Sequence, residues 1–200
     1  MYIDMPEFLD MRKCIFTTFL LTPSLFILGQ SSDVNKLRNL VKLDLGLQGI
    51  GFTFEPRVGK NTTIDLSAGI GGGYNISTDD LTYEVDITNP ALYFSVTPKF
   101  FYNRQKRIEK GKASLLNAGN YIGLRIKYTT KGLSENSEIY DALLMNVHWG
   151  LQRTLGIKWS FMTHIGAGYA MDATDLNHAN GTFYPALEFR FSYVFTKIKS

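Results

Sequence analysis

The chain has 200 residues, of which 20% are charged and 14% are aromatic, a composition that excludes an intrinsically disordered protein. Its 21 Lys and Arg and 18 Asp and Glu give a net charge of +3, which argues against the concentrated basic surface of a dedicated nucleic-acid-binding protein. The single cysteine excludes a disulfide scaffold and a thiolate metal site, while 18 Gly, 14 Phe and 11 Tyr favour a β-rich fold.

The first 29 residues have the order of features found in a secretory signal peptide. Basic residues at 12–13 are followed by an apolar run at 14–28, and Gly29 then precedes a polar segment. The apolar run has 15 residues, fewer than the roughly 20 that a membrane-spanning helix requires. We therefore predict that residues 1–29 direct export, with an ordinary buried helix as the alternative.

The sequence also predicts where translation starts and how the chain after the signal peptide is divided. Residues 1–10 contain three acidic residues, which is unusual at the front of a signal peptide, so we expect translation to start at Met11. Residues 30–40 are expected to form an N-terminal periplasmic segment, 41–195 a β-barrel and 196–200 a short tail.

Beyond residue 40, apolar and polar residues alternate with a period of two, which predicts half-buried β-strands rather than helices. In residues 121–129, for example, aliphatic residues at even positions alternate with Gly123, Arg125 and Lys127. The same alternation occurs in 62–76, 91–102, 121–129, 142–152, 157–170 and 183–195. These six segments are the predicted strands with the strongest pattern.

The segment 41–57 changes frame within its length. Its apolar residues stand at odd positions up to Leu47 and at even positions from Ile50. One strand cannot hold both sets on one face, because a one-residue slip turns every side chain over. A tight turn near Gln48 and Gly49 would give two short strands, and a β-bulge is the alternative. With the turn, the count is eight, an even number that lets an up-and-down antiparallel sheet close into a barrel.

Two kinds of barrel fit eight such strands after an export signal. One is a soluble lipocalin-like barrel with an apolar interior, and the other is a transmembrane barrel with an apolar outer wall. The polar face of the strands carries mostly small residues and few charges, which suits the narrow lumen of an eight-stranded transmembrane barrel. Aromatic residues expected to form interfacial girdles at its rims are Tyr74, Tyr102, Tyr128, Trp149, Trp159, Tyr169 and Phe195.

The stretches at 94–103 (FSVTPKFFYN) and 119–124 (GNYIGL), together with the strand patterning, carry a resemblance to a known family. Over residues 41–195 the chain resembles the small eight-stranded outer-membrane β-barrels of the OmpA/OmpX type, especially those of Bacteroidetes. The strand at 183–195 is similar to the assembly signal that these proteins present to the insertion machinery. In the family the terminal aromatic is often the last residue, whereas five residues follow it here.

If the C-terminus is periplasmic, the connections at 75–90, 130–141 and 171–182 lie outside the cell. Apart from Lys131 their charges are acidic: Asp79, Asp80, Glu84, Asp86, Glu135, Glu138, Asp141, Asp172 and Asp175. We expect them to form only a solvated anionic surface; the alternatives are that they bridge to lipopolysaccharide through divalent cations or that they recognise a partner. The basic segment at 103–118 is expected to be a solvated turn, with contact to phospholipid headgroups as the alternative.

Charged side chains on the inward face are expected to form a closed, ion-paired lumen, because an isolated buried charge is very costly. The predicted members are Asp65, Arg125, Lys127, His148, His164, Glu188 and Arg190. An enzymatic alternative would use His148 or His164 as a general base near Ser160 or Ser192, or His178 at the rim. The sequence contains no Gly-x-Ser-x-Gly nucleophile motif, so we expect neither catalysis nor a cofactor.

The sequence therefore predicts a monomeric β-barrel of the Gram-negative outer membrane, with a structural or surface-interaction role and no nucleic-acid partner. Its partners would be outer-membrane lipid, lipopolysaccharide and the insertion machinery. Two other functions stay open, a lipid-modifying envelope enzyme and a soluble lipocalin-like carrier of an apolar ligand. A narrow pore is a variant of the first function.

Overall fold

A computed structural model of the chain describes residues 36–76, 81–85, 89–132, 139–174 and 181–196. The predicted signal peptide, the start at Met11, His178 and most of the tail at 196–200 lie outside the described residues.

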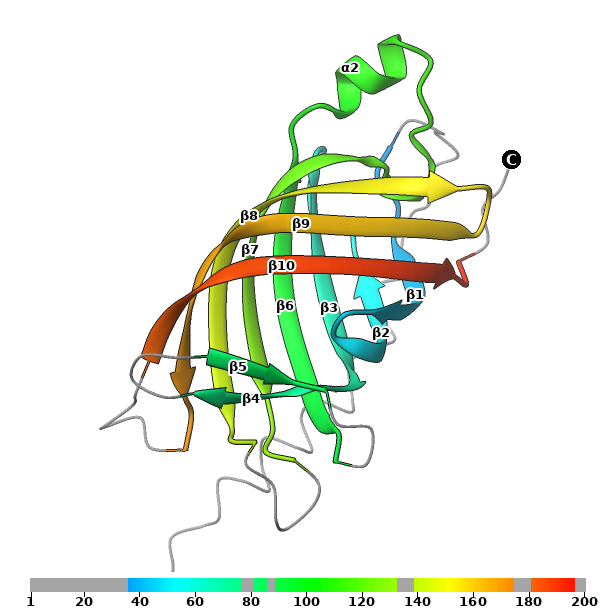
Figure 1. The fold of residues 1–200 in the computed structure, drawn as a ribbon. Helices are drawn as coiled ribbons and strands as arrows, with labels where there is room; N and C mark the ends of the chain where they lie inside the picture. The colour runs from blue at the N-terminus through cyan, green and yellow to red at the C-terminus, as the bar shows by residue number, and fades with distance from the viewer. Residues whose placement is uncertain (1–35, 77–80, 86–88, 133–138, 175–180, 197–200) are drawn as a thin grey trace, which may run out of the picture. The chain divides into compact units, whose positions relative to one another are not determined.

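Eight strands form one closed antiparallel barrel in which each strand pairs with its neighbours in chain order (Figure 1). The barrel strands are β1 (Leu40–Gly46), β2 (Gly49–Glu55), β3 (Thr62–Gly71), β6 (Ala91–Phe101), β7 (Gly119–Thr129), β8 (Ala142–Leu155), β9 (Trp159–Asp172) and β10 (Gly181–Val194). β10 pairs with β1 and closes the sheet. The predicted all-β, up-and-down barrel of eight strands is confirmed.

The turn between β1 and β2 lies where the sequence changes frame. Gly46 pairs with Gly49, so the connection consists of Leu47 and Gln48. Gly49 has a φ of 108°, a backbone conformation that glycine adopts without the steric cost other residues meet. The predicted tight turn is therefore present, and it supplies the eighth strand.

The segment predicted as one strand at 62–76 is divided in two. β3 ends at Gly71, and the chain then forms a separate hairpin of β4 (Gly73–Ile76) and β5 (Leu81–Glu84) outside the barrel sheet. A side chain at Gly71 would collide with the carbonyl oxygen of Gln48, so glycine permits this close approach. The expectation that Tyr74 lies on the outer wall is wrong, because leaving the sheet breaks the alternation and Tyr74 is buried.

A short helix, α2 (Arg104–Glu109), and a 3₁₀ turn, η1 (Leu115–Asn117), lie between β6 and β7. The sequence predicted only a turn here. The Arg104 guanidinium donates hydrogen bonds to the carbonyls of Ser114 and Ala118, which tie the helix to the connection that follows. Burial lowers the pKa of Arg104 to about 10, so this group stays charged at neutral pH. No helix within the described residues is long and apolar enough to cross a membrane.

We call the end of the barrel that carries α2 the helix end, and the end that carries β4, β5 and the β1–β2 turn the hairpin end (Figure 1). The C-terminus of β10 and the start of β1 lie at the helix end, because β1 runs from that end to the β1–β2 turn.

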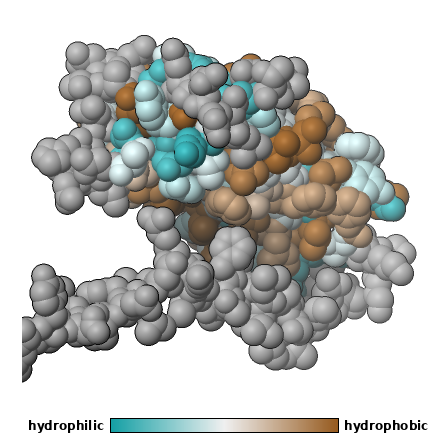
Figure 2. All heavy atoms as spheres, turned by 90° about the horizontal axis from the view of Figure 1, so that it is seen from below, coloured by the Kyte–Doolittle hydropathy of each residue, from teal (hydrophilic) through white to brown (hydrophobic). Residues whose placement is uncertain are grey.

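The side chains of the barrel strands alternate between a buried interior and an exposed outer wall. In β6 the alternation runs from Ala91 to Phe101 without interruption. Most of the exposed positions are large and apolar, and brown and tan spheres cover much of the middle and right-hand part of the described surface in Figure 2. Within the eight strands, Arg153 is the one charged residue at an outward position. This arrangement is the reverse of a water-soluble domain, which buries its apolar side chains.

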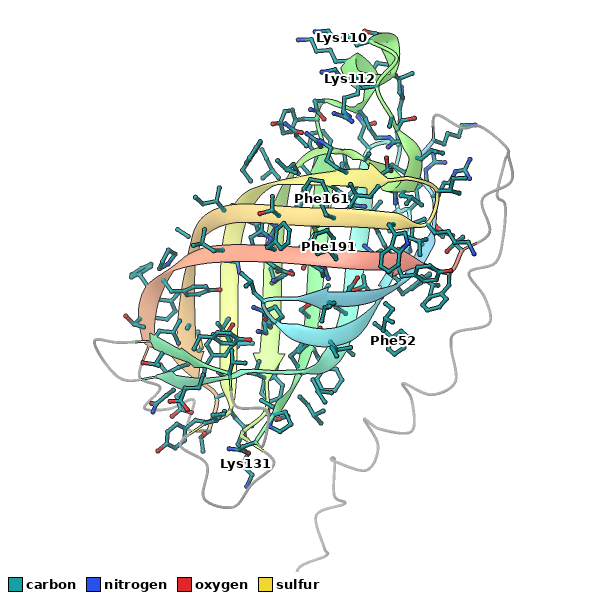
Figure 3. All side chains as sticks on the ribbon, turned by 45° about the vertical axis from the view of Figure 1, so that its right-hand side comes forward. Phe52, Lys110, Lys112, Lys131, Phe161 and Phe191 are labelled. Atoms are coloured by element: carbon teal, nitrogen blue, oxygen red, sulfur yellow. The ribbon has the colours of Figure 1, made fainter. Side chains whose placement is uncertain are left out.

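Charged residues lie at both ends of this apolar wall. In Figure 3, Phe52, Phe161 and Phe191 point away from the middle of the barrel, with Lys110 and Lys112 at the helix end and Lys131 at the hairpin end. The apolar wall is therefore a band with polar margins.

Candidate functional site

The barrel interior is filled by an ion-pair network that begins between β1, β2, β3 and β6. Lys42 Nζ lies 2.9 Å from Glu55 Oε2 and 3.8 Å from Asp65 Oδ2. Lys99 Nζ lies 2.9 Å from Glu55 Oε1 and 2.7 Å from Asp65 Oδ1, and it donates a hydrogen bond to Gln152. Each of these two lysines therefore faces both carboxylates, which offsets the cost of burying four charges.

Arg190 on β10 extends this network across the barrel. Its Nη1 lies 3.0 Å from Asp44 Oδ2, its Nη2 lies 3.1 Å from Asp65 Oδ2, and its Nε lies 3.4 Å from Glu188 Oε1. Thr53 donates a hydrogen bond to the Asp44 carboxylate. One guanidinium thus joins three carboxylates from three strands, a use that suits its planar set of five donors.

Glu188 connects the network to β7. Its carboxylate forms an ion pair with the Arg125 guanidinium, which also donates a hydrogen bond to Thr97 Oγ1 at 3.3 Å. The network therefore runs without a break from Lys42 on β1 to Arg125 on the opposite wall.

Two stacked histidines lie beside Glu188. The rings of His148 and His164 are 3.9 Å apart between centroids and 20° from parallel, and His148 Nδ1 shares a hydrogen bond with Asn146 Oδ1 at 2.7 Å. The ring of His148 lies over Gly123, where any side chain would meet it. Among the described residues, no hydrogen bond joins either ring to a serine hydroxyl, so the geometry that a histidine–serine pair requires is not formed.

Lys127 differs from the other buried lysines because no carboxylate within the described residues forms an ion pair with it. Its Nζ donates hydrogen bonds to Gln48 Oε1 and, at 3.0 Å, to the hydroxyl of Tyr74. It also lies 4.6 Å from the Tyr74 ring centroid and 5.5 Å from that of Tyr93. All these partners are neutral, and cation–π contacts are weaker than a buried ion pair.

The charge count of the interior gives the same result. Apart from the two histidines, the buried ionisable acids and bases of the barrel strands are Lys42, Lys99, Arg125, Lys127 and Arg190 against Asp44, Glu55, Asp65 and Glu188. Five cations therefore face four carboxylates, and Lys127 is the cation left over.

All seven residues predicted to face the lumen lie in the interior and are buried. The network also contains Lys42, Asp44, Glu55 and Lys99, which the prediction did not include. The same period-two alternation marks them, since they stand two residues apart from other inward positions of their strands. Very little space remains at the centre, where the cavity beside Arg190 has a volume of about 10 Å³, about the least that can hold one water molecule.

The aromatic residues predicted for the girdles lie at several places. Tyr102, Tyr128, Trp149, Trp159 and Phe195 are exposed and Tyr169 is half-buried, whereas Tyr74 lies inside. The indole N–H of Trp149 donates a hydrogen bond to the Tyr102 hydroxyl at 2.6 Å, which joins two of these residues near the helix end. Their contact with a lipid interface stays a prediction.

Three of the predicted acidic loop residues, Glu84, Asp141 and Asp172, lie among the described residues at the hairpin end. At the hairpin end, Asp141 accepts a hydrogen bond from the backbone of Lys131, and Asp172 accepts one from the backbone of Thr174. Glu84 lies at the end of β5. The other acidic loop residues, Asp79, Asp80, Asp86, Glu135, Glu138 and Asp175, lie outside the described residues. The described carboxylates of Asp141 and Asp172 therefore order their own loops.

Within the described part of the chain, no three histidine, cysteine or acidic side chains are grouped closely enough to hold a metal ion. No protein-family model, curated protein or solved structure matches the chain. The function is therefore inferred from the geometry of the barrel alone.

Proposed function

We propose that the protein is a β-barrel of the bacterial outer membrane, with a closed polar lumen and a structural or surface-interaction role. The observation that carries this proposal is the outer wall of the eight strands, which is apolar, exposed and nearly free of charge. Covering that wall with lipid removes its apolar surface from water, which stabilises the protein by about 25 cal/mol for each Å² covered. The same wall left in water would favour aggregation.

The interior supports the same proposal. A soluble carrier of an apolar ligand needs an apolar cavity along its axis. Here the centre of the barrel holds Lys42, Glu55, Asp65, Lys99 and Arg190, all ion-paired. A closed barrel also satisfies the main-chain hydrogen bonds of its strands internally, as a transmembrane structure must.

We infer an orientation from the connections. The helix end, where β10 ends, would face the periplasm, and the hairpin end would face the outside, where transmembrane barrels carry their longer loops. The acidic connections at the hairpin end would then meet lipopolysaccharide or a surface partner. The proposal contains no catalytic step and no cofactor, and it treats the barrel as a monomer inserted by the outer-membrane assembly machinery.

Membrane fractionation, followed by an SDS gel of boiled and unboiled protein, tests the proposal. We expect the protein in the outer-membrane fraction, with a mobility shift on boiling because a closed barrel resists SDS until it is heated. Protein that stays soluble without detergent would overturn the membrane location and favour the lipocalin-like alternative. For the enzymatic alternative, replacement of His178 or His148 should change the lipid profile of the envelope; an unchanged profile argues against it.

A further inference from the structure

The barrel wall is incomplete at the hairpin end of β10. On one side, residues 181–193 of β10 pair with β9. On the other side, only Arg190–Val194 pair with β1. β1 stops at Gly46, and the last hydrogen bond between the two strands runs from the Leu47 amide to the Phe189 carbonyl at 3.1 Å. Figure 1 shows β10 continuing well beyond the β1–β2 turn. Residues 181–188 therefore present a strand edge without a neighbouring barrel strand.

The sequence of this edge limits its capacity to pair with another strand. In an antiparallel sheet, alternate residues direct their main-chain groups to opposite sides. Since the carbonyl of Phe189 points towards β1, the main-chain groups of residues 187, 185 and 183 point to the open edge as well. Residue 185 is a proline, which has no amide hydrogen to donate and is confined to edges of this kind.

A cavity of about 290 Å³ opens at this edge and reaches the interior. Its lining includes Leu47 of the β1–β2 turn, Leu81 and Tyr83 of β5, and β10 residues 184–187, which we together call its rim. The Tyr83 hydroxyl donates a hydrogen bond to the Leu47 carbonyl at 2.6 Å, which joins the hairpin to the β1–β2 turn. The cavity is therefore bounded by three elements that hydrogen bonds hold in place.

The floor of the cavity carries the unmatched cation of the lumen. Lys127 and Gln48, its hydrogen-bond acceptor, both line the cavity, and so does Tyr74, its second acceptor. A buried cation without a carboxylate is costly, and an anionic ligand group would remove that cost. The other basic side chains of the floor, Arg125 and His164, already face Glu188: the Arg125 guanidinium is ion-paired with it, and His164 Nδ1 lies 3.8 Å from its Oε2.

We propose that this cavity binds a single-chain anionic amphiphile, with its carboxylate at Lys127 Nζ and its acyl chain lying towards the open edge of β10. The volume lies just below the range for small-molecule sites, about 300–1,000 Å³, so it admits one chain rather than a two-chain lipid. Entry of the chain from the side rests on the proposed membrane location, because Leu187 and Phe183 on this part of β10 are exposed on the outer wall. Binding itself does not depend on that location.

The test uses full-length folded protein in nanodiscs of an uncharged lipid and palmitic acid labelled with ¹³C at its carboxyl carbon. We expect saturable binding of one molecule per barrel, detected as a separate carboxyl resonance. Lys127→Gln should weaken binding about tenfold or more, the factor that corresponds to loss of a charged hydrogen bond. Lys112→Gln is the matched control, since this lysine is exposed at the opposite end of the barrel. This variant should bind palmitic acid as tightly as wild type.

A second variant tests the cavity without removing the charge. Leu81→Trp places a larger side chain at the rim, on the hairpin rather than in the barrel wall, and should also weaken binding. Palmityl alcohol, followed by its own ¹³C label, should bind about tenfold more weakly than the acid. The mobility shift on boiling checks that each variant is folded.

Three results would each overturn the proposal. Lys127→Gln could bind palmitic acid as tightly as wild type, the alcohol could bind as tightly as the acid, or the acid could partition into the sample without saturation. These results are separate from the membrane location. If fractionation finds the protein soluble, the same titration in aqueous buffer still tests whether the cavity binds the acid.

Discussion

At the scale of single residues, two lysines in the same lumen differ in what surrounds their charge. Lys99 faces the carboxylates of Glu55 and Asp65, whereas Lys127 has neutral partners. Replacing each by Met, which has a similar length, should therefore have unequal effects. Lys99→Met leaves two carboxylates short of a cation and should lower the free energy of unfolding by about 3 kcal/mol or more. Lys127→Met removes an unmatched buried charge and should leave that free energy unchanged or raise it by about 1 kcal/mol.

Urea titrations of the two variants in detergent micelles, followed by tryptophan fluorescence, measure these free energies. Lys112→Met, at an exposed position in the connection after α2, is the control and should match wild type. If Lys127→Met lowered the free energy of unfolding as much as Lys99→Met does, Lys127 would have an anionic partner in the folded protein.

The sequence predicted single residues well wherever the strand alternation continues. Arg125, Lys127 and Glu188 stand in register with inward neighbours, so their burial follows from a period of two. Tyr74 stands in register with the outward positions Leu66 and Ile70 of β3, but the chain leaves the sheet after Gly71 and the period no longer specifies its face. Which carboxylate each lysine meets was not predictable, because those contacts depend on the register between β1, β2, β3 and β6, which the alternation within each strand does not specify.

At the scale of elements, the β1–β2 turn depends on one glycine. Gly49 has a φ of 108°, and a Cβ there would collide with the carbonyl oxygen of Ile70 on β3. Gly49→Ala should therefore destabilise the barrel by about 1–3 kcal/mol, through backbone strain and displacement of β3. The same urea titration measures the loss.

Substitutions at two other glycines distinguish backbone strain from the collision with β3. Gly111 has a φ of 63° but nothing within 4 Å of a Cβ, so Gly111→Ala reports backbone strain alone. Gly59 has only ordinary contacts near such a Cβ, at 3.5 Å, and Gly59→Ala should be neutral. If Gly49→Ala cost no more than Gly111→Ala, the close approach to β3 would have no energetic effect.

The elements that the sequence did not predict lie between the barrel strands. The β1–β2 turn was predictable because the change of frame at 41–57 has a direct geometric meaning. The hairpin of β4 and β5 packs against Leu144 and Tyr184 inside the barrel, a contact that local patterning does not contain. α2 has six residues, too few to show a helical period, and it is held by the hydrogen bonds of Arg104 to carbonyls beyond its own end.

At the scale of the whole molecule, the ion-pair network decides whether the barrel conducts. Arg190 joins Asp44, Asp65 and Glu188 across the interior, and Arg125 carries the network to β7. An ion that passed through would have to displace these paired groups in a narrow space, at a cost of several kcal/mol. We therefore expect no steady conductance from the folded protein in a planar lipid bilayer. Voltage-clamp recording checks this, with a known pore protein in the same bilayer as the positive control. Stable single-channel steps from the wild-type protein would contradict a closed lumen, and would mean that the network opens in the membrane.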